Sequence, residues 1–112
     1  MKQTSSLTRN LAEAQEQYAA THLYHHETLW RIYTEDVAGV DYVGAISRYF
    51  SGATYTFSIG LWHSKRERSI VIDIVGTEAD LQRVAWLATD LKREAKQESV
   101  LVTASPCKTL EF

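Results

Sequence analysis

The feature that most constrains the fold is a pair of hydrophobic strand patterns separated by a short polar run. Every second residue is large and apolar over residues 53–62, and isoleucine recurs at positions 70, 72 and 74 within residues 69–75. This alternation is typical of β-strands, and the polar run 64–68 indicates a turn, so together they predict a β-hairpin. We expect the face of the hairpin that is turned towards the helices to carry Tyr55, Phe57, Ile59, Leu61, Ile70, Ile72 and Ile74.

The segment after the hairpin predicts the longest helix of the chain. An apolar stripe at helical spacing runs through residues 77–97, and Thr77 suits the N-cap position of that helix. A thin apolar stripe predicts an N-terminal helix over residues 7–22. Shorter patterns predict three more elements, namely a strand over 28–34, a helix over 40–50 that buries Val40, Val43, Ile46 and Phe50, and a strand over 99–104.

The order of these elements predicts the fold class. A strand–helix–strand–strand–helix–strand order is typical of the ferredoxin-like split βαβ arrangement. We therefore expect an α+β protein in which an N-terminal helix precedes a ferredoxin-like βαββαβ sandwich with a four-stranded antiparallel sheet. The strands 28–34 and 69–75 are expected at its centre, running parallel to each other. The predicted boundaries are 1–27 for the helix and connector, 28–105 for the core and 106–112 for a tail.

The composition excludes several classes of protein. The 112 residues suit one domain, and the net charge of -2 argues against wholesale binding of nucleic acid. Cys107 is the single cysteine, which excludes an internal disulfide framework and a multi-cysteine zinc site. No apolar run approaches the roughly 18 residues that span a bilayer, and the first residues lack the apolar stretch of a secretory signal. These observations predict a cytoplasmic protein with no membrane partner.

Arg31 and Asp73 are expected on the open face of the sheet, opposite the helices. An aspartate in the middle of a central strand is costly unless it is paired or wet, and Arg31 on the neighbouring strand is its predicted partner. The pair is interpreted either as a solvated cross-strand ion pair or as part of a ligand or partner site. The apolar residues around it indicate that a second subunit or the N-terminal helix covers part of this face: Leu29, Tyr33, Val71 and Val75.

The predicted hairpin turn is basic and flanked by aromatic side chains. Because arginine suits the paired oxygens of phosphates and carboxylates, the turn is interpreted either as a site for a small anion or as a solubilising turn. Trp86 lies on a polar helix face, where it marks an interface or folds over the edge of the apolar stripe. The candidate ligand-binding residues are Arg31, Asp73, Trp62, His63, Arg66 and Arg68, and the candidate interface residues are Tyr33, Val71, Val75 and Trp86.

Candidate catalytic and metal-binding groups are few. His22, His25 and His26 could bring two imidazoles together on one helix, but no further ligand completes the set, so we favour a solvated connector over a metal site. Cys107 has no His or Asn context that would make it a nucleophile. Glu35 and the acid that follows it favour a turn cap over acid–base chemistry. We expect no catalytic residue, no metal, no cofactor and no enzyme activity.

The predicted order of elements, with its basic hairpin, resembles the nitrogen-regulatory PII proteins and the CutA metal-tolerance proteins in topology and length. None of the sequence motifs of those families is present, so this resemblance assigns no residue a role. The segments 49–54, 60–62, 69–75 and 97–103 are similar to a run in uncharacterised small phage and bacterial proteins, over about residues 28–104. That resemblance implies a compact, phage-encoded accessory protein that acts against host defence, and it implies no mechanism.

Three functions are compatible with these features. The leading interpretation is a non-catalytic homo-oligomeric binding protein that holds a small anionic ligand, of nucleotide type, in a cleft between subunits. The alternative is a protein-inhibitor module that binds a host enzyme through the open sheet face. The third is a small enzyme of the αβ-barrel dimer type, for which His63 and Glu35 are the candidate residues in a concave pocket.

Overall fold

The computed structural model describes residues 11, 13 and 24–112. The chain divides into two compact units, Glu27–Cys107 and Met1–His26 together with Lys108–Phe112. The first of these units contains the core and the surfaces described below. The helix predicted over residues 7–22 falls almost entirely outside the described residues.

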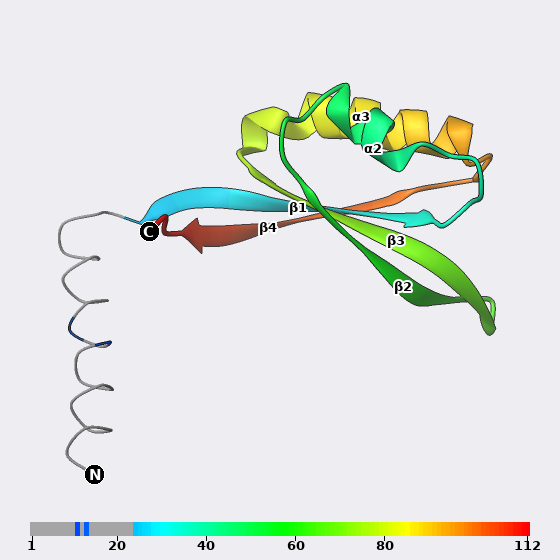
Figure 1. Cartoon of the computed structure of the whole chain (residues 1–112), viewed down its shortest axis with the longest axis horizontal. Coiled ribbons are helices and arrows are strands. Elements are labelled where there is room, and N and C mark those ends of the chain that lie inside the picture. The colour runs from blue at the N-terminus through cyan, green and yellow to red at the C-terminus, as the bar shows by residue number, and fades with distance from the viewer. Residues whose placement is uncertain (1–10, 12, 14–23) are drawn as a thin grey trace, which may run out of the picture. The chain divides into compact units, whose positions relative to one another are not determined.

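The larger unit is built on a four-stranded antiparallel sheet with two α-helices, which confirms the predicted α+β class. Figure 1 shows both helices over one face of the sheet. The strands follow the order β2-β3-β1-β4 across the sheet, so β2 and β4 are the edge strands. The elements are β1 (His25–Glu35), α2 (Tyr42–Ser47), β2 (Thr54–Trp62), β3 (Lys65–Gly76), α3 (Leu81–Glu94) and β4 (Leu101–Thr109).

The two central strands, β1 and β3, run antiparallel, so the parallel orientation expected from the sequence is wrong. The reason lies in the connections. β2 and β3 form an antiparallel hairpin, and β1 is antiparallel to β3, so β1 and β2 point in the same direction. The crossover through α2 therefore joins two strands of the same direction, and β3 lies between them with the opposite direction.

The hairpin turn is tighter than predicted. It consists of His63 and Ser64, and β3 begins directly after it at Lys65, within the polar run that the sequence assigned to the turn. The φ angles of His63 and Ser64 are 49° and 62°, as a two-residue hairpin turn with left-handed central residues requires. The basic residues of the run therefore belong to a strand, which orients them alternately to its two faces.

Other boundaries also differ from the predicted ones. β1 begins at His25, three residues early, and β4 runs through Pro106 to Thr109, past the predicted start of the tail. α3 is preceded by a 3₁₀ turn over Glu78–Asp80, where the Asp80 carboxylate accepts a hydrogen bond of 2.8 Å from the backbone N–H of Thr77. The residues predicted to open this helix thus cap it, as expected.

α2 is only six residues long, shorter than the predicted helix over 40–50. Its N-cap is Asp41, whose carboxylate accepts a hydrogen bond of 2.9 Å from the backbone N–H of Gly44. The helix buries Tyr42 rather than Val43, which is 55% exposed and was predicted to lie on the buried face. The hydroxyl of Tyr42 anchors the preceding turn, because it accepts from the N–H of Val37 at 2.9 Å.

The hydrophobic core lies between the two helices and the central strands. The Trp30 indole N–H donates a hydrogen bond of 2.9 Å to the carbonyl of Thr77, which ties β1 to the start of the second helical segment. No residue of β2 belongs to this core. Its members are Trp30, Ile32, Tyr42, Ala45, Ile46, Phe50, Ile70, Ile72, Ile74, Val84, Leu87 and Leu91.

Candidate functional site

The face of β2 that carries its large apolar side chains is exposed. The register pairs Tyr55 with Ile72 and Phe57 with Ile70, so these residues lie on the same sheet face as the core isoleucines, as predicted. The helices, however, leave this part of the face open. We call the apolar side chains of β2 on this face the β2 stripe. Its members, with their exposed fractions, are Tyr55 (41%), Phe57 (69%), Ile59 (69%) and Leu61 (73%).

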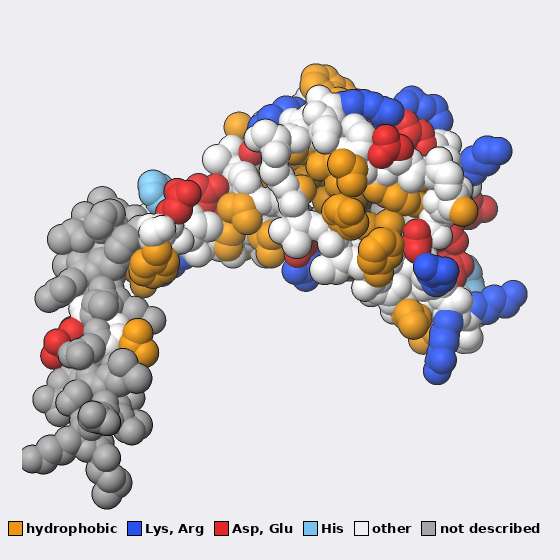
Figure 2. Space-filling model, viewed as in Figure 1, with side chains coloured by type: hydrophobic (Ala, Val, Ile, Leu, Met, Phe, Trp, Pro, Cys, Tyr) orange, Lys and Arg blue, Asp and Glu red, His pale blue; other side chains and the backbone are white. Residues whose placement is uncertain are grey.

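The short α2 explains why the stripe is uncovered. The connection from β1 to β2 crosses over β3, so it is the segment placed to shield the β2 side of the sheet. A helix of six residues is about 9 Å long, whereas a strand of nine residues extends over about 30 Å. Figure 1 shows the β2–β3 hairpin extending away from the helical layer. Figure 2 shows hydrophobic side chains gathered between that layer and the hairpin.

The two edge strands of the sheet differ in how they discourage pairing with other chains. Natural edge strands usually carry a proline, charged residues or a bulge, because a bare edge presents unpaired N–H and C=O groups. β4 contains Pro106 and Lys108. β2 has nine residues, TYTFSIGLW, with neither a charge nor a proline. The apolar stripe and the unprotected edge therefore coincide on one strand.

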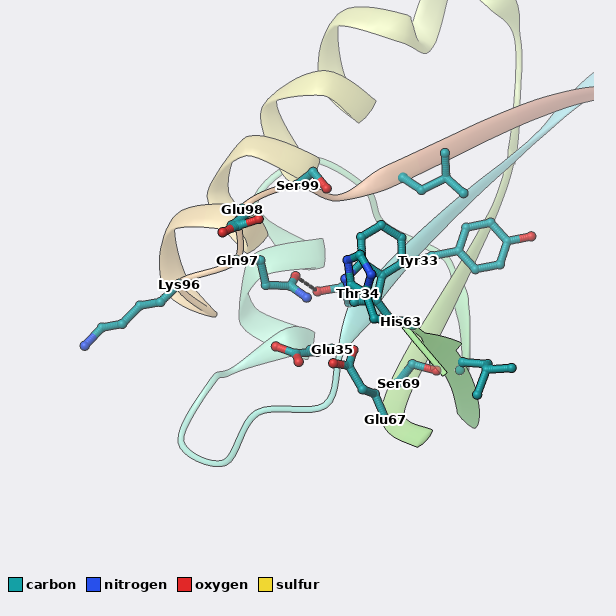
Figure 3. A pocket seen from close by; sticks show the side chains of 14 residues that line it. Tyr33, Thr34, Glu35, His63, Glu67, Ser69, Lys96, Gln97, Glu98 and Ser99 are labelled. Atoms are coloured by element: carbon teal, nitrogen blue, oxygen red, sulfur yellow. Dashed lines mark hydrogen bonds between the residues drawn. The ribbon is translucent and has the colours of Figure 1, made fainter. Parts of the chain in front are cut away.

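A cleft of about 650 Å³ lies beside the hairpin, between the end of β1 and the connection from α3 to β4 (Figure 3). The Thr34 hydroxyl and the Gln97 side-chain carbonyl, 2.7 Å apart, join these two walls by a hydrogen bond. Carboxylates predominate among its charged groups, and Lys96 points away from the cleft in Figure 3. The lining residues are Tyr33, Thr34, Glu35, Gly60, Leu61, Trp62, His63, Glu67, Ser69, Lys96, Gln97, Glu98, Ser99 and Leu101.

Arg31 and Asp73 form the predicted cross-strand ion pair. They are direct partners in the β1–β3 register, with Arg31 Nε 2.6 Å from Asp73 Oδ1 and Nη2 3.2 Å from Oδ2. The hydrogen bond to Asp73 is the main cause that raises the pKa of Arg31. Both side chains are partly exposed, so the pair is a solvated, bidentate ion pair on the open face. One edge of the Arg31 guanidinium is thus occupied by Asp73.

The other predicted ligand-binding residues lie in two separate places. Trp62 and His63 line the cleft, with their ring centroids 4.9 Å apart in an edge-on contact. Arg66 and Arg68 pair with Leu61 and Ile59 in the hairpin register, so they lie on the stripe face and not in the cleft. Arg68 forms an ion pair with Asp36 at 3.2 Å. The six residues therefore do not form one site.

The predicted interface residues are also divided between two faces. Tyr33 and Val71 are register partners on the open face, and Val75 lies further along the same face and is exposed. Trp86 is half-exposed on the helical layer, and its ring centroid lies 6.2 Å from that of Tyr49. Trp86 therefore packs at the junction of the two helical segments, and its place at an interface stays a prediction.

The junction of the helical segments is held by the carboxylate of Asp90. It accepts hydrogen bonds from the Tyr49 hydroxyl at 2.6 Å, from Arg48 Nη1 at 3.2 Å and from Arg93 Nη2 at 3.0 Å. The hydrogen bond from Tyr49 is the main cause that lowers the pKa of Asp90, with the two arginines adding to it. The same hydrogen bond raises the pKa of the Tyr49 phenol. This network fixes α3 to the end of α2, so its role is structural.

The histidine cluster and the cysteine are placed as follows. His25 and His26 are neighbours in β1, so they do not share a helix face, and His22 lies outside the described residues. Cys107 lies in β4 and is partly buried. Within residues 24–112, the structure brings together no group of three or more His, Cys, Asp or Glu side chains that could hold a metal ion. The described helices include none with the length and apolarity that crossing a membrane requires.

Sequence reasoning missed two features of this region. It predicted the β2 stripe on the helix side but did not predict that α2 is too short to cover the stripe. The absence of charge in 54–62 is a sequence sign of an unprotected edge strand. It also missed the cleft residues Glu67 and Gln97, which come from segments distant in sequence. Only the tertiary structure brings these two side chains to one place.

Comparison with other proteins adds no assignment. The chain matches no protein-family model, and no curated protein matches it. The class that the fold and the surface define is therefore an α+β protein with a bare, apolar sheet edge.

Proposed function

We propose that the chain is a non-catalytic binding protein that acts through the edge of β2. In this proposal the sheet has the ferredoxin-like arrangement, and its bare edge takes up an extended segment of a protein as a fifth strand. The observation that carries the proposal is the coincidence of the β2 stripe with an uncharged, proline-free edge. Strand addition uses both features, because the main chain supplies hydrogen bonds and alternate side chains supply apolar contacts.

The size of the β2 stripe supports this proposal. Large apolar side chains each present roughly 150–250 Å² when fully exposed, so the exposed parts of these four add up to roughly 380–630 Å². The largest apolar patch on a typical monomer measures about 300–600 Å² and is often functional. A surface of this extent beside a free ladder of hydrogen-bonding groups is costly in a protein that works alone.

A small anionic, nucleotide-type ligand has less support than a protein strand. Arg31 already pairs with Asp73, and Arg68 with Asp36. Arg66 has no ion-pair partner in the described part of the chain, but it lies apart from Trp62 and His63. We therefore give the edge priority over the anion site as the binding surface.

The edge proposal is tested with a labelled peptide that has the sequence of β2 and lysines added at its ends for solubility. We expect its fluorescence anisotropy to rise on titration with the protein, and we expect Phe57→Lys to abolish the rise because it places a charge on the edge. Val43→Lys is the matched control, since Val43 is similarly exposed but lies on α2. The proposal fails if the peptide does not bind, or if both variants bind it equally.

The cleft supports a second candidate function, acid–base catalysis. His63 and Glu35, the two residues that the sequence offered for an enzyme, line the same cleft together with Glu67. The test is a panel of nitrophenyl esters and phosphates, assayed with the wild type, His63→Ala and Glu35→Gln. Turnover that falls in both variants supports catalysis, whereas activity that is absent or unaffected by either substitution contradicts a catalytic role for this pair on those substrates.

A further inference from the structure

We propose that the strand bound at the β2 edge is β2 of a second copy of this chain. The two strands run antiparallel about a two-fold axis at Ser58, and the two sheets join into one. This inference rests on the proposed function, and it commits that function to one partner. Three observations carry it, namely the symmetry of β2, its lack of charge and the position of Arg66 beside it.

The distribution of apolar residues in β2 is symmetric about Ser58. When the strand pairs with itself about that residue, Tyr55 lies opposite Leu61 and Phe57 lies opposite Ile59, so every residue of the stripe meets an apolar partner. Centring the axis on Phe57 would instead place Leu61 opposite Ala53, and centring it on Ile59 would place Tyr55 opposite His63. The register about Ser58 also overlaps the full length of the strand, from Thr54 to Trp62.

A two-fold axis perpendicular to the sheet keeps each face on its own side. The β2 stripes of the two copies therefore meet on one face, between the two helical layers, and form a single apolar band of eight side chains. A strand from an unrelated protein would need its own alternation in the same phase to do this, because a slip of one residue turns every side chain to the other face. A second copy has the same alternation because its β2 sequence is identical.

Charge also favours a second copy. Two identical chains of net charge -2 repel weakly, but β2 itself carries no charge, so no like charges meet in the ladder. On the stripe face Arg66 lies beside Leu61, and Tyr55 of the second copy comes next in the same row. Neighbouring strands are about 4.8 Å apart, so a guanidinium that extends over Leu61 can reach that ring and form a cation–π contact. Arg66 thereby gains a partner that it lacks among the described residues.

The expected dimer is of moderate affinity. The β2 stripe offers less than the roughly 800 Å² per partner that standard interfaces bury, even with Trp62 and the main chain added. We expect a mass of about 25 kDa, twice the 12.7 kDa of one chain, by light scattering at about 200 µM, and dissociation on dilution through the micromolar range.

The register is tested by disulfide formation in a Cys107→Ser background. Ser58→Cys places two cysteines opposite each other across the axis, where the Cα separation of about 4.5–5.5 Å suits a disulfide. Thr56→Cys is the matched control, because it is exposed on the same strand and face but lies about 13 Å along the strand from its copy. We expect mild oxidation to cross-link the Ser58 variant at least tenfold faster than the Thr56 variant.

The outcomes separate this inference from the proposed function. A monomeric wild type at about 200 µM that still binds the β2 peptide overturns the second copy and leaves strand addition in place. Equal or reversed cross-linking rates overturn the register about Ser58. A chain that neither dimerises nor binds the peptide overturns both proposals. Monomeric behaviour together with strand addition would favour a different protein as the partner, as in an inhibitor module.

Discussion

Ile59→Thr is the substitution that examines the edge most directly. Ile59 is 69% exposed in one chain and lies next to Phe57 of the second copy in the proposed pair. Full burial of an isoleucine side chain contributes about 1.5–3 kcal/mol, and we take half of that for a contact that stays open on one side. Because the two-fold axis repeats the contact, the loss is about 1.5–3 kcal/mol for each dimer. The dissociation constant should therefore rise about 10- to 150-fold.

The assay is sedimentation equilibrium over a dilution series. Thermal unfolding is measured at protein concentrations below the dissociation constant, where the chain is monomeric. Threonine keeps the β-branched shape of isoleucine, so the lone chain should unfold at nearly the same temperature as the wild type. Val43→Thr is the control at an exposed site off the edge. An unchanged dissociation constant for Ile59→Thr would contradict the proposed pairing. So would a variant that destabilises the dilute chain by as much as it weakens the dimer, since Ile59 would then be buried within one copy.

Three further predictions concern the fold. Asp90→Asn should lower the free energy of unfolding by about 1–2 kcal/mol in urea denaturation, because the buried carboxylate loses charge-assisted hydrogen bonds. The folded-state pKa of Asp90 lies below its unfolded value, so the stabilisation by its carboxylate is complete above about pH 4 and is lost as the pH falls through the folded-state pKa. The difference in unfolding free energy between wild type and Asp90→Asn should therefore shrink in acid. A constant difference down to pH of about 2 would contradict this prediction. Ser64→Gly should raise the free energy of unfolding by about 0.5–1 kcal/mol, because Ser64 has a φ of 62° that glycine adopts without strain, whereas Ser58→Gly in the adjoining strand should lower it.

The sequence predicted the features that depend on alternation within a strand. Arg31 and Asp73 were placed together because both lie on the polar side of neighbouring strands, and the register confirms the pair. The hairpin turn was misplaced for a physical reason. Lys65 and Arg68 lie where β3 extends beyond the helices, so nothing selects apolar residues there, and their polarity was taken for a turn. His63 and Ser64, which do turn, lack the Asn-Gly signal of such turns.

The alternation of apolar and polar residues along a strand does not determine whether a helix covers the apolar face. The pattern from Tyr55 to Leu61 says which side chains share a side, and the structure agrees. Whether that side is dry depends on the length of α2, which lies elsewhere in the chain. The cleft is non-local in the same way, since Glu67 and Gln97 meet only once β3 and the end of the second helix are in place.

The order of strands in the sheet also has a consequence for how the protein is made. β1 leaves the ribosome first, but its neighbours in the sheet, β3 and β4, begin only at Lys65 and Leu101. Among the described strands, the β2–β3 hairpin is the one ladder between strands consecutive in sequence, so it can form while the rest of the chain is still being synthesised. If the proposed dimer forms, this hairpin would meet other nascent hairpins on the same message before α3 is made to cover the isoleucines. Neighbouring ribosomes would thus favour assembly in pairs from the start, and refolding from denaturant should become slower and less complete as the protein is diluted.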